Sequence, residues 1–175
     1  MKKVLFAIPL ALALTGCGSD IDLVKGGVME FNQTTTLGKA LDNWKSCESR
    51  EWEEFETDNG IKVVQFTCQH KISQYMSKAK SLLSEEEQAK ANHLDIASNI
   101  QTFQFTINQG DTFQIDNVQV KTTWQDGTSF EDSQKPVEQL ETAYANNLNF
   151  DPAELNEMGA AQISYVFSMI KMCAK

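Results

Sequence analysis

The sequence predicts an α+β fold, in which an antiparallel sheet of hairpins is covered by helices on one face. Two observations support this prediction. Segments of alternating apolar and polar residues flank turn motifs such as Asp58-Asn59-Gly60, and segments with apolar residues three and four positions apart lie between them. The order of these segments has no strand–helix–strand rhythm, which argues against a parallel sheet.

The first elements are short strands and one helix. Residues 28–31 favour a short strand, and the apolar spacing from Leu37 to Trp44 predicts a brief helix that places the tryptophan against the core. Aromatic and β-branched residues on both sides of the Asp-Asn-Gly motif then predict a β-hairpin, with strands at 52–57 and 61–69.

The middle of the chain combines helices and a meander. An apolar stripe from Ile72 to Leu83 predicts a helix, and Ser84 followed by Glu87 forms a capping-box pattern that predicts a second helix as far as Ile96. Alternating residues then predict strands over 103–107 and 113–124. The alternation changes parity at Asp116-Asn117, which predicts a bulge or a second small turn there.

The last elements are a short strand and two helices. Asp126-Gly127 predicts a reversal into a strand at 128–130, and Pro136 suits the first residue of the next helix. Asp151-Pro152-Ala153-Glu154 predicts the start of the final helix, with Asp as its N-cap. Two apolar stripes on this helix predict burial on a wide face, and polar residues such as Gln162 argue against a membrane span.

The first segment is typical of an export signal. Lys2 and Lys3 precede eleven apolar residues, Val4 to Leu14, a length that suits a secretory leader and is too short to span a bilayer. The next residues, Leu14-Thr15-Gly16-Cys17, resemble the lipobox of bacterial lipoproteins. This resemblance implies cleavage before Cys17 and a diacylglyceryl group on its thiol, which anchors the chain to a membrane because several acyl chains hold far more firmly than one.

The same resemblance predicts three parts and a location. The parts are a signal peptide of residues 1–16, a lipidated N-terminus and tether of residues 17–27, and a single α+β domain of residues 28–175. In enteric-type bacteria an Asp directly after the lipid-bearing cysteine retains a lipoprotein in the inner membrane. Gly18 takes that position here, so we expect an outer-membrane lipoprotein whose domain faces the periplasm.

The charge balance narrows the choice of partners. Two of the 15 basic residues lie in the predicted leader, so 13 basic and 24 acidic residues remain, a net charge of −11. This charge argues against nucleic acid, whose affinity comes from contacts of Lys and Arg with phosphates. It also argues against a domain that lies flat on anionic lipid.

Three cysteines remain after Cys17, in a compartment that permits disulfides, so one bridge and one free thiol are expected. We predict the bridge between Cys47 and Cys68, which bracket the hairpin, with a stabilisation of about 3 kcal/mol for a loop of this length. Cys173 is expected to be buried and unpaired near the end of an apolar helix. Pairing of Cys173 with either of the other two remains an alternative from spacing alone.

Catalytic and metal-binding patterns are weak throughout the chain. We expect His70 and His93 at the surface or at helix ends, and the further ligands that a zinc site beside Cys68 and His70 requires are not evident. Ser77-Lys78-Ala79-Lys80 matches the S-x-x-K pattern of penicillin-recognising enzymes, but their S-D-N and K-T-G motifs are absent. We therefore predict no enzyme, no cofactor and no metal site.

An acidic segment is the best candidate for a binding surface. It surrounds Trp52 and Phe55, whose rings are expected to face the core, and its carboxylates could receive a cationic partner: Glu51, Glu53, Glu54, Glu56 and Asp58. We therefore expect a non-enzymatic binding or structural component of the cell envelope, with another envelope protein as its partner. The alternative is an inhibitor or immunity-like protein that acts on a basic cell-wall hydrolase.

Two wider resemblances add little to this expectation. The runs TTTLGKALDNW and WEEFETDNGIKVVQF resemble small uncharacterised bacterial lipoproteins in which a helix precedes an aromatic hairpin, and this resemblance implies no activity. In size and anchoring the chain is similar to the small accessory lipoproteins of the outer-membrane β-barrel machinery. That similarity carries over no residues.

Overall fold

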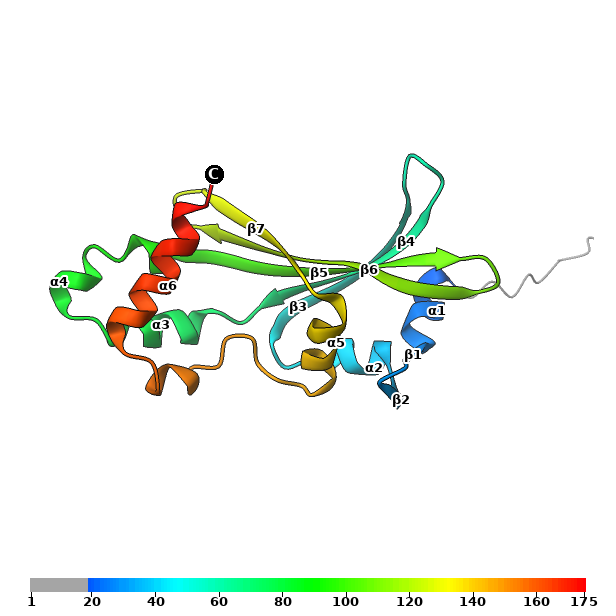
Figure 1. Ribbon diagram of the computed structural model, residues 1–175, viewed down its shortest axis with the longest axis horizontal. Coiled ribbons are helices and arrows are strands. Elements are labelled where there is room, and N and C mark those ends of the chain that lie inside the picture. The colour runs from blue at the N-terminus through cyan, green and yellow to red at the C-terminus, as the bar shows by residue number, and fades with distance from the viewer. Residues whose placement is uncertain (1–18) are drawn as a thin grey trace, which may run out of the picture.

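The computed structural model describes residues 19–175 and confirms the α+β class (Figure 1). A central antiparallel sheet of five strands has the order β3-β4-β5-β6-β7, and β1 and β2 pair in a separate two-stranded sheet. The predicted signal peptide and Cys17 lie outside the described residues. Every strand of the central sheet pairs with its neighbour in the sequence, as the predicted hairpin and meander require.

The structure has these elements. The strands are β1 (Val28–Met29), β2 (Asn32–Thr36), β3 (Cys47–Glu56), β4 (Lys62–His70), β5 (Ile96–Asn108), β6 (Thr112–Trp124) and β7 (Ser129–Gln134). The helices are α1 (Asp20–Gly26), α2 (Leu37–Asp42), α3 (Ser73–Ser81), α4 (Glu85–Gln88), α5 (Pro136–Tyr144) and α6 (Ala160–Met172), with single 3₁₀ turns η1 (Asn92–Leu94) and η2 (Glu154–Asn156).

The predicted turns and the predicted bulge are present. Gly60 and Gly127 close the reversals with φ angles of +77° and +83°, a left-handed backbone that glycine adopts without steric cost. The register of β5 and β6 shifts where Gln104 pairs with Asn117 and Phe105 pairs with Ile115. Asp116 is therefore the extra residue of a β-bulge, and the change of parity in the sequence is its signature.

The disulfide Cys47–Cys68 joins the start of β3 to β4, as predicted, with a Cα–Cα distance of 5.3 Å. Both cysteines are buried. Cys173 is unpaired among the described residues, but it is exposed, so the prediction that it would be buried is wrong. The reason is that α6 ends at Met172, and Cys173 lies past the helix at the outer surface.

The segment predicted as a tether is in large part a helix. Helix α1 begins after the N-cap Ser19, which forms a capping box with Asp22, and it buries Val24 completely in the core. An ion pair of 2.8 Å between Lys25 and Asp42 holds α1 to α2. The folded domain therefore begins at residue 19 or 20, and not at residue 28.

Two helices differ in length from the prediction. The capping box at Ser84 is present, but α4 has four residues because it buries none of them, and the chain then turns so that η1 buries Leu94. Asp151 accepts a hydrogen bond of 2.9 Å from the backbone N–H of Ala153, yet only the single turn η2 follows. The final helix α6 starts later, after Gly159.

The helices pack on one face of the central sheet and form two hydrophobic clusters with it. The first cluster lies under α1, α2 and α5, and its large members are Leu37, Leu41, Trp44, Phe66, Phe103, Phe105 and Leu140. The second lies under α3 and α6, and its large members are Tyr75, Met76, Leu94, Trp124, Leu155, Ile163 and Phe167. Figure 1 shows α1 and the β5–β6 turn at one end of the molecule and α4 and α6 at the other.

The opposite face of the sheet is polar. There Gln65, Gln104 and Asn117 are direct cross-strand neighbours on β4, β5 and β6, with Glu53 beyond them on the edge strand β3. Asn117 Nδ2 donates to Gln104 Oε1 at 3.2 Å, Gln104 Nε2 donates to Gln65 Oε1 at 2.8 Å, and Gln65 donates to the Glu53 carboxylate. All three donors point toward the negative charge, an arrangement in which each bond polarises the next.

Candidate functional site

The end of the domain nearest Cys17 is the first place to look for a functional surface. Three peptide units separate Cys17 from Asp20, a span of about 11 Å at most. Because α1 packs on the core, the folded domain lies beside the predicted lipidation site and not at the end of a long tether. Helix α1, strand β1 and the two hairpin turns at residues 57–61 and 109–111 lie together at one end of the sheet (Figure 1). We call this part of the domain the anchor-proximal end.

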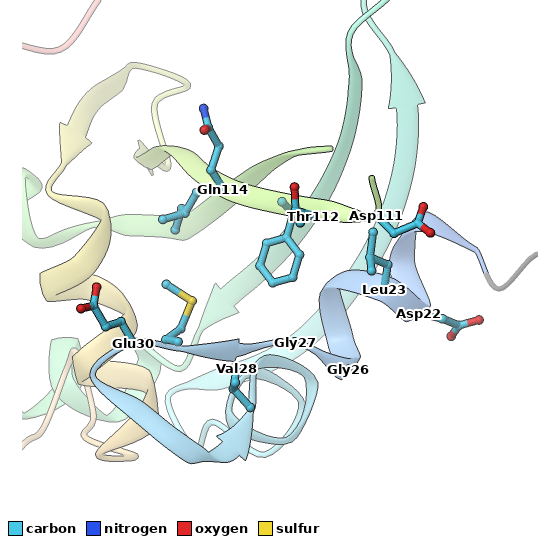
Figure 2. A pocket seen from close by; sticks show the side chains of 12 residues that line it. Asp22, Leu23, Gly26, Gly27, Val28, Glu30, Asp111, Thr112 and Gln114 are labelled. Carbon is cyan, nitrogen blue, oxygen red and sulfur yellow. The ribbon is translucent and has the colours of Figure 1, made fainter. Parts of the chain in front are cut away.

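The anchor-proximal end contains a hollow between α1, β1 and the start of β6. Its volume is about 590 Å³, and its apolar lining residues are Leu23, Val28, Met29, Phe113 and Ile115. Figure 2 shows Asp22 and Asp111 at one end of this hollow and Glu30 at the other. The hollow therefore combines an apolar lining with three carboxylates.

The acidic segment predicted as a binding surface lies on and beside the edge strand β3. Glu51, Glu53, Glu54 and Glu56 are on the strand, and Asp58 is in the turn at its end; all five side chains are exposed. They do not form one flat patch. Glu54 is on the face of Trp52, since Trp52 pairs with the buried Phe66, whereas Glu53 lies on the opposite polar face with Gln65.

The two aromatic residues of this segment behave differently. Trp52 packs on Phe66 with a centroid distance of 4.9 Å, and its indole N–H donates to Asp42 at 2.8 Å, so the prediction that it faces the core is confirmed. Phe55 is 40% exposed, and the same prediction is wrong for it. The two residues are three positions apart on one strand and must therefore point to opposite faces.

His70 is buried at the centre of a polar network, which corrects the expectation that it lies at the surface. Its Nδ1 lies 2.8 Å from Ser46 Oγ and its Nε2 lies 2.9 Å from Gln101 Oε1. An amide oxygen can only accept, so Nε2 carries the proton and Nδ1 accepts the hydrogen bond from the Ser46 hydroxyl. Burial lowers the pKa of His70, which favours this neutral imidazole.

The network joins distant parts of the chain. The backbone N–H of Asn149 donates to Ser46 Oγ at 3.0 Å, and the Asn149 side chain donates to Gln101 Oε1 at 3.1 Å. Ser46 borders a hollow of about 270 Å³ but is only 2% exposed. The serine–histidine pair is therefore a closed, satisfied network that fixes the 146–150 loop to the sheet.

The other side chains considered in the sequence analysis, those of His93, Ser77 and Lys80, do not come together in one site. His93 is half-buried beside Ser164, with 2.9 Å between Nε2 and Oγ. Ser77 is exposed on α3, and Lys80 of the S-x-x-K pattern pairs with Asp95. Within residues 19–175, no three His, Cys, Asp or Glu side chains are grouped as metal ligands. In that same part of the chain, no helix has the length and hydropathy that crossing a bilayer requires.

The anchor-proximal hollow is not predicted from the sequence, because residues 17–27 are interpreted as a lipidated N-terminus and tether. The available signal was the pair Ser19 and Asp22, three positions apart, which is the spacing of a helix N-cap and its N3 residue. The burial of His70 had no comparable local signal. Its partner Gln101 is 31 positions away, and Asn149, which contacts Ser46 and Gln101 in the same network, comes from still farther along the chain.

Comparison with known proteins identifies the first segment. A family model described as the prokaryotic membrane lipoprotein lipid attachment site matches residues 1–17. No curated protein and no solved structure matches the chain. The match ends at Cys17, the residue that the lipobox designates for lipid attachment, so the chain is a bacterial lipoprotein anchored to a membrane.

Proposed function

We propose that this lipoprotein is a non-enzymatic binding component of the outer membrane, and that its anchor-proximal end contacts a basic segment of another envelope protein. The residues that support this proposal are exposed carboxylates around the hollow and along the hairpin, where they lie on both faces of the edge strand, and we call them together the acidic surface: Asp22, Glu30, Glu51, Glu53, Glu54, Glu56, Asp58 and Asp111.

The observation that supports the proposal most directly is that none of these carboxylates forms a direct ion pair within the described part of the chain, and that the cation nearest the hairpin end, Lys62 opposite Glu56, pairs with Asp20 instead. Seven ion pairs are present among residues 19–175, and none of them uses a carboxylate of the acidic surface. Carboxylates in excess of the nearby cations repel one another, and a basic partner relieves this repulsion. The net charge of −9 for the chain adds a long-range attraction for such a partner.

The character of the partner follows from the energies of exposed charges. A single exposed ion pair contributes about 0–1 kcal/mol, so a stable contact requires several Lys or Arg residues together. The apolar lining of the hollow adds a place for the aliphatic part of such side chains. A basic, partly apolar segment of a membrane-associated protein fits both requirements.

The test compares two double variants with the same change in charge. Glu51→Gln with Glu56→Gln alters the acidic surface, whereas Glu85→Gln with Glu157→Gln alters exposed acids at the other end of the domain. A photo-crosslinking residue at position 58 should capture a basic envelope protein in intact cells. We expect the first variant to reduce the yield severalfold and the second to leave it unchanged. Equal yields from both variants would reject the acidic surface as the contact.

The outer-membrane location has its own test. Gly18→Asp should move the lipoprotein into the inner-membrane fraction in an enteric host, and the control Gly18→Ala should leave it in the outer-membrane fraction. If the wild-type protein is already in the inner membrane, this part of the proposal is wrong.

The same surface suits the alternative function of inhibiting a basic cell-wall hydrolase. The purified lipoprotein should then slow a cationic murein hydrolase at stoichiometric concentration, and Glu51→Gln with Glu56→Gln should weaken the inhibition. Unchanged activity across a panel of such enzymes excludes this alternative. The proposal of an envelope partner is then decided by the crosslinking experiment.

A further inference from the structure

A separate cavity lies beneath α6, away from the acidic surface. It has a volume of about 200 Å³ and is bounded by the helix-covered face of β5, β6 and β7, by α6, and by the loop that carries Phe150. Its lining is largely apolar and includes Ile96, Val120, Phe130, Phe150, Phe167 and Ile170. Most of these residues belong to, or pack against, the second hydrophobic cluster, so the cavity is an incompletely filled part of the core.

One polar side chain in this cavity lacks a partner. Asn99 lines the cavity and is only 4% exposed. Its Nδ2 donates to Thr122 Oγ1 at 2.8 Å, but its Oδ1 is buried and has no hydrogen-bond partner among the described residues. Leaving such an acceptor buried and unpaired costs about 1–3 kcal/mol, and native structures satisfy the great majority of these groups.

The next inward-facing residue of β5 shows how the same fold satisfies a buried amide. Gln101 accepts from His70 at 2.9 Å and donates to Gln139 at 2.9 Å. Asn99 is two positions away on the same face, where no equivalent donor reaches it from α6 or β7. The missing donor and the unfilled apolar volume coincide in one place.

We propose that this cavity binds a small amphiphilic molecule whose apolar body fills the space under α6 and whose hydrogen-bond donor reaches Asn99 Oδ1. A cavity of about 150 Å³ is known to hold a benzene ring, so 200 Å³ accommodates a ring or branched chain of roughly six to eight carbons with its donor group. The donor is a hydroxyl or an ammonium group. This inference is independent of the acidic surface and of the proposed function.

The polar groups around the cavity disfavour ligands with an anionic head group. Asn99 offers an acceptor, and among residues 19–175 the one ionisable residue that lines the cavity is Asp132 on the edge strand β7. A carboxylate or phosphate head group would face the lone pairs of Oδ1 and the negative charge of Asp132. The site therefore discriminates against fatty acids and phosphorylated compounds.

The experiment uses four probes that share one aromatic ring and differ in the substituent on it. Benzyl alcohol, benzylamine, toluene and benzoate are titrated into the full-length lipoprotein in lipid nanodiscs, and binding is read from the NMR shifts of the Asn99 side-chain amide and of the Val120 and Ile170 methyl groups. These signals report the cavity itself, and the affinities are compared on the free aqueous concentration of each probe, because toluene partitions into lipid more than the polar probes do. We expect benzyl alcohol or benzylamine to bind roughly tenfold more tightly than toluene, and benzoate not to bind. Which of the two donors binds more tightly distinguishes a hydroxyl ligand from an ammonium ligand.

Two variants and one matched control complete the test. Asn99→Leu should abolish the preference for the donor over toluene, and Val120→Phe should fill the cavity and prevent binding of every probe. Asn117→Leu makes the same chemical change on the opposite face of the sheet and should leave the preference intact. The proposal is overturned if toluene or benzoate binds the wild type as tightly as the donors, or if no probe shifts the cavity signals; both results depend on the wild-type protein alone.

Discussion

Gly27 lies directly against the ring of Phe113: a Cβ atom on residue 27 would stand 2.3 Å from the ring's Cζ. This contact lets the end of α1 approach β6 and shapes the anchor-proximal hollow, which both residues line. The backbone of Gly27 has an ordinary φ of −70°, so the requirement for glycine comes from space and not from backbone strain. Its neighbour Gly26 has no atom within 4 Å of the same position.

The two adjacent glycines therefore give opposite predictions. Gly27→Ala should lower the free energy of unfolding by about 1–3 kcal/mol, because the added methyl group displaces Phe113. Gly26→Ala should leave stability unchanged or raise it by up to about 1 kcal/mol, because alanine is the better helix former. Chemical denaturation followed by tryptophan fluorescence measures both. Equal effects of the two substitutions would contradict the close contact.

The disulfide is expected to contribute much of the stability of the hairpin. Cys47→Ala with Cys68→Ala should cost about 3 kcal/mol from the loop of 21 residues, and more if the buried sulfur atoms leave a cavity. Cys173→Ser is the control, since Cys173 is exposed and outside the bridge, and it should change stability by less than about 0.5 kcal/mol. A control variant as unstable as the double variant would show that Cys173 takes part in the covalent framework.

Because His70 is buried as a neutral imidazole, we expect the protein to lose stability in mild acid. Its pKa is lowered in the folded state by burial, so below pH 6.5 the unfolded chain binds a proton that the folded chain does not. The stabilisation is complete above pH 6.5 and falls as the pH decreases from there, with a slope of at most about 1.4 kcal/mol per pH unit. His93 also contributes to the loss of stability at low pH, because burial lowers its pKa as well.

Stability measured from pH 7.5 to pH 5 tests this assignment. His70→Gln should lower stability at pH 7.5 and remove most of the slope, whereas His93→Gln should keep most of it, because His93 is far less buried. A wild-type stability that rises as the pH falls through this range would contradict the buried neutral imidazole.

The sequence alone was sufficient where the determinants were local. The Asp-Asn-Gly turn, the parity change at Asp116 and the spacing of Cys47 and Cys68 each lie within one hairpin, and all three predictions were confirmed. Trp44 was also placed correctly in the core, although helix α2 ends at Asp42 and the tryptophan lies two residues beyond it.

The sequence was insufficient where the determinants were distant in the chain. The burial of His70 depends on Gln101 and Asn149, and the cavity around Asn99 depends on where α6 crosses the sheet. The acidic side chains of residues 51–58 are exposed, but their division between two faces follows from the pairing of β3 with β4. None of these relationships has a signal in residues that are neighbours along the chain.

Helix α6 supplies the last prediction, because one side of it is buried and the other faces water. The prediction of a wide buried face was wrong: Ile163 is fully buried, whereas Tyr165 is 66% exposed and Met172 is 78% exposed. Ile163 and Phe167 face the second hydrophobic cluster, whereas Tyr165, Val166 and Met169 are exposed, so both predicted stripes contain exposed residues.

Substitutions on the buried side and on the exposed side of α6 should therefore differ clearly in their effect on stability. Phe167→Ala should cost about 3–5 kcal/mol, because a large buried ring is lost next to an existing cavity that cannot collapse around it. Tyr165→Lys should change stability by less than about 0.5 kcal/mol, since its side chain already faces water. Thermal unfolding of both variants decides the orientation of the helix. A costly Tyr165→Lys together with a harmless Phe167→Ala would mean that α6 is rotated and that the cavity beneath it has a different lining.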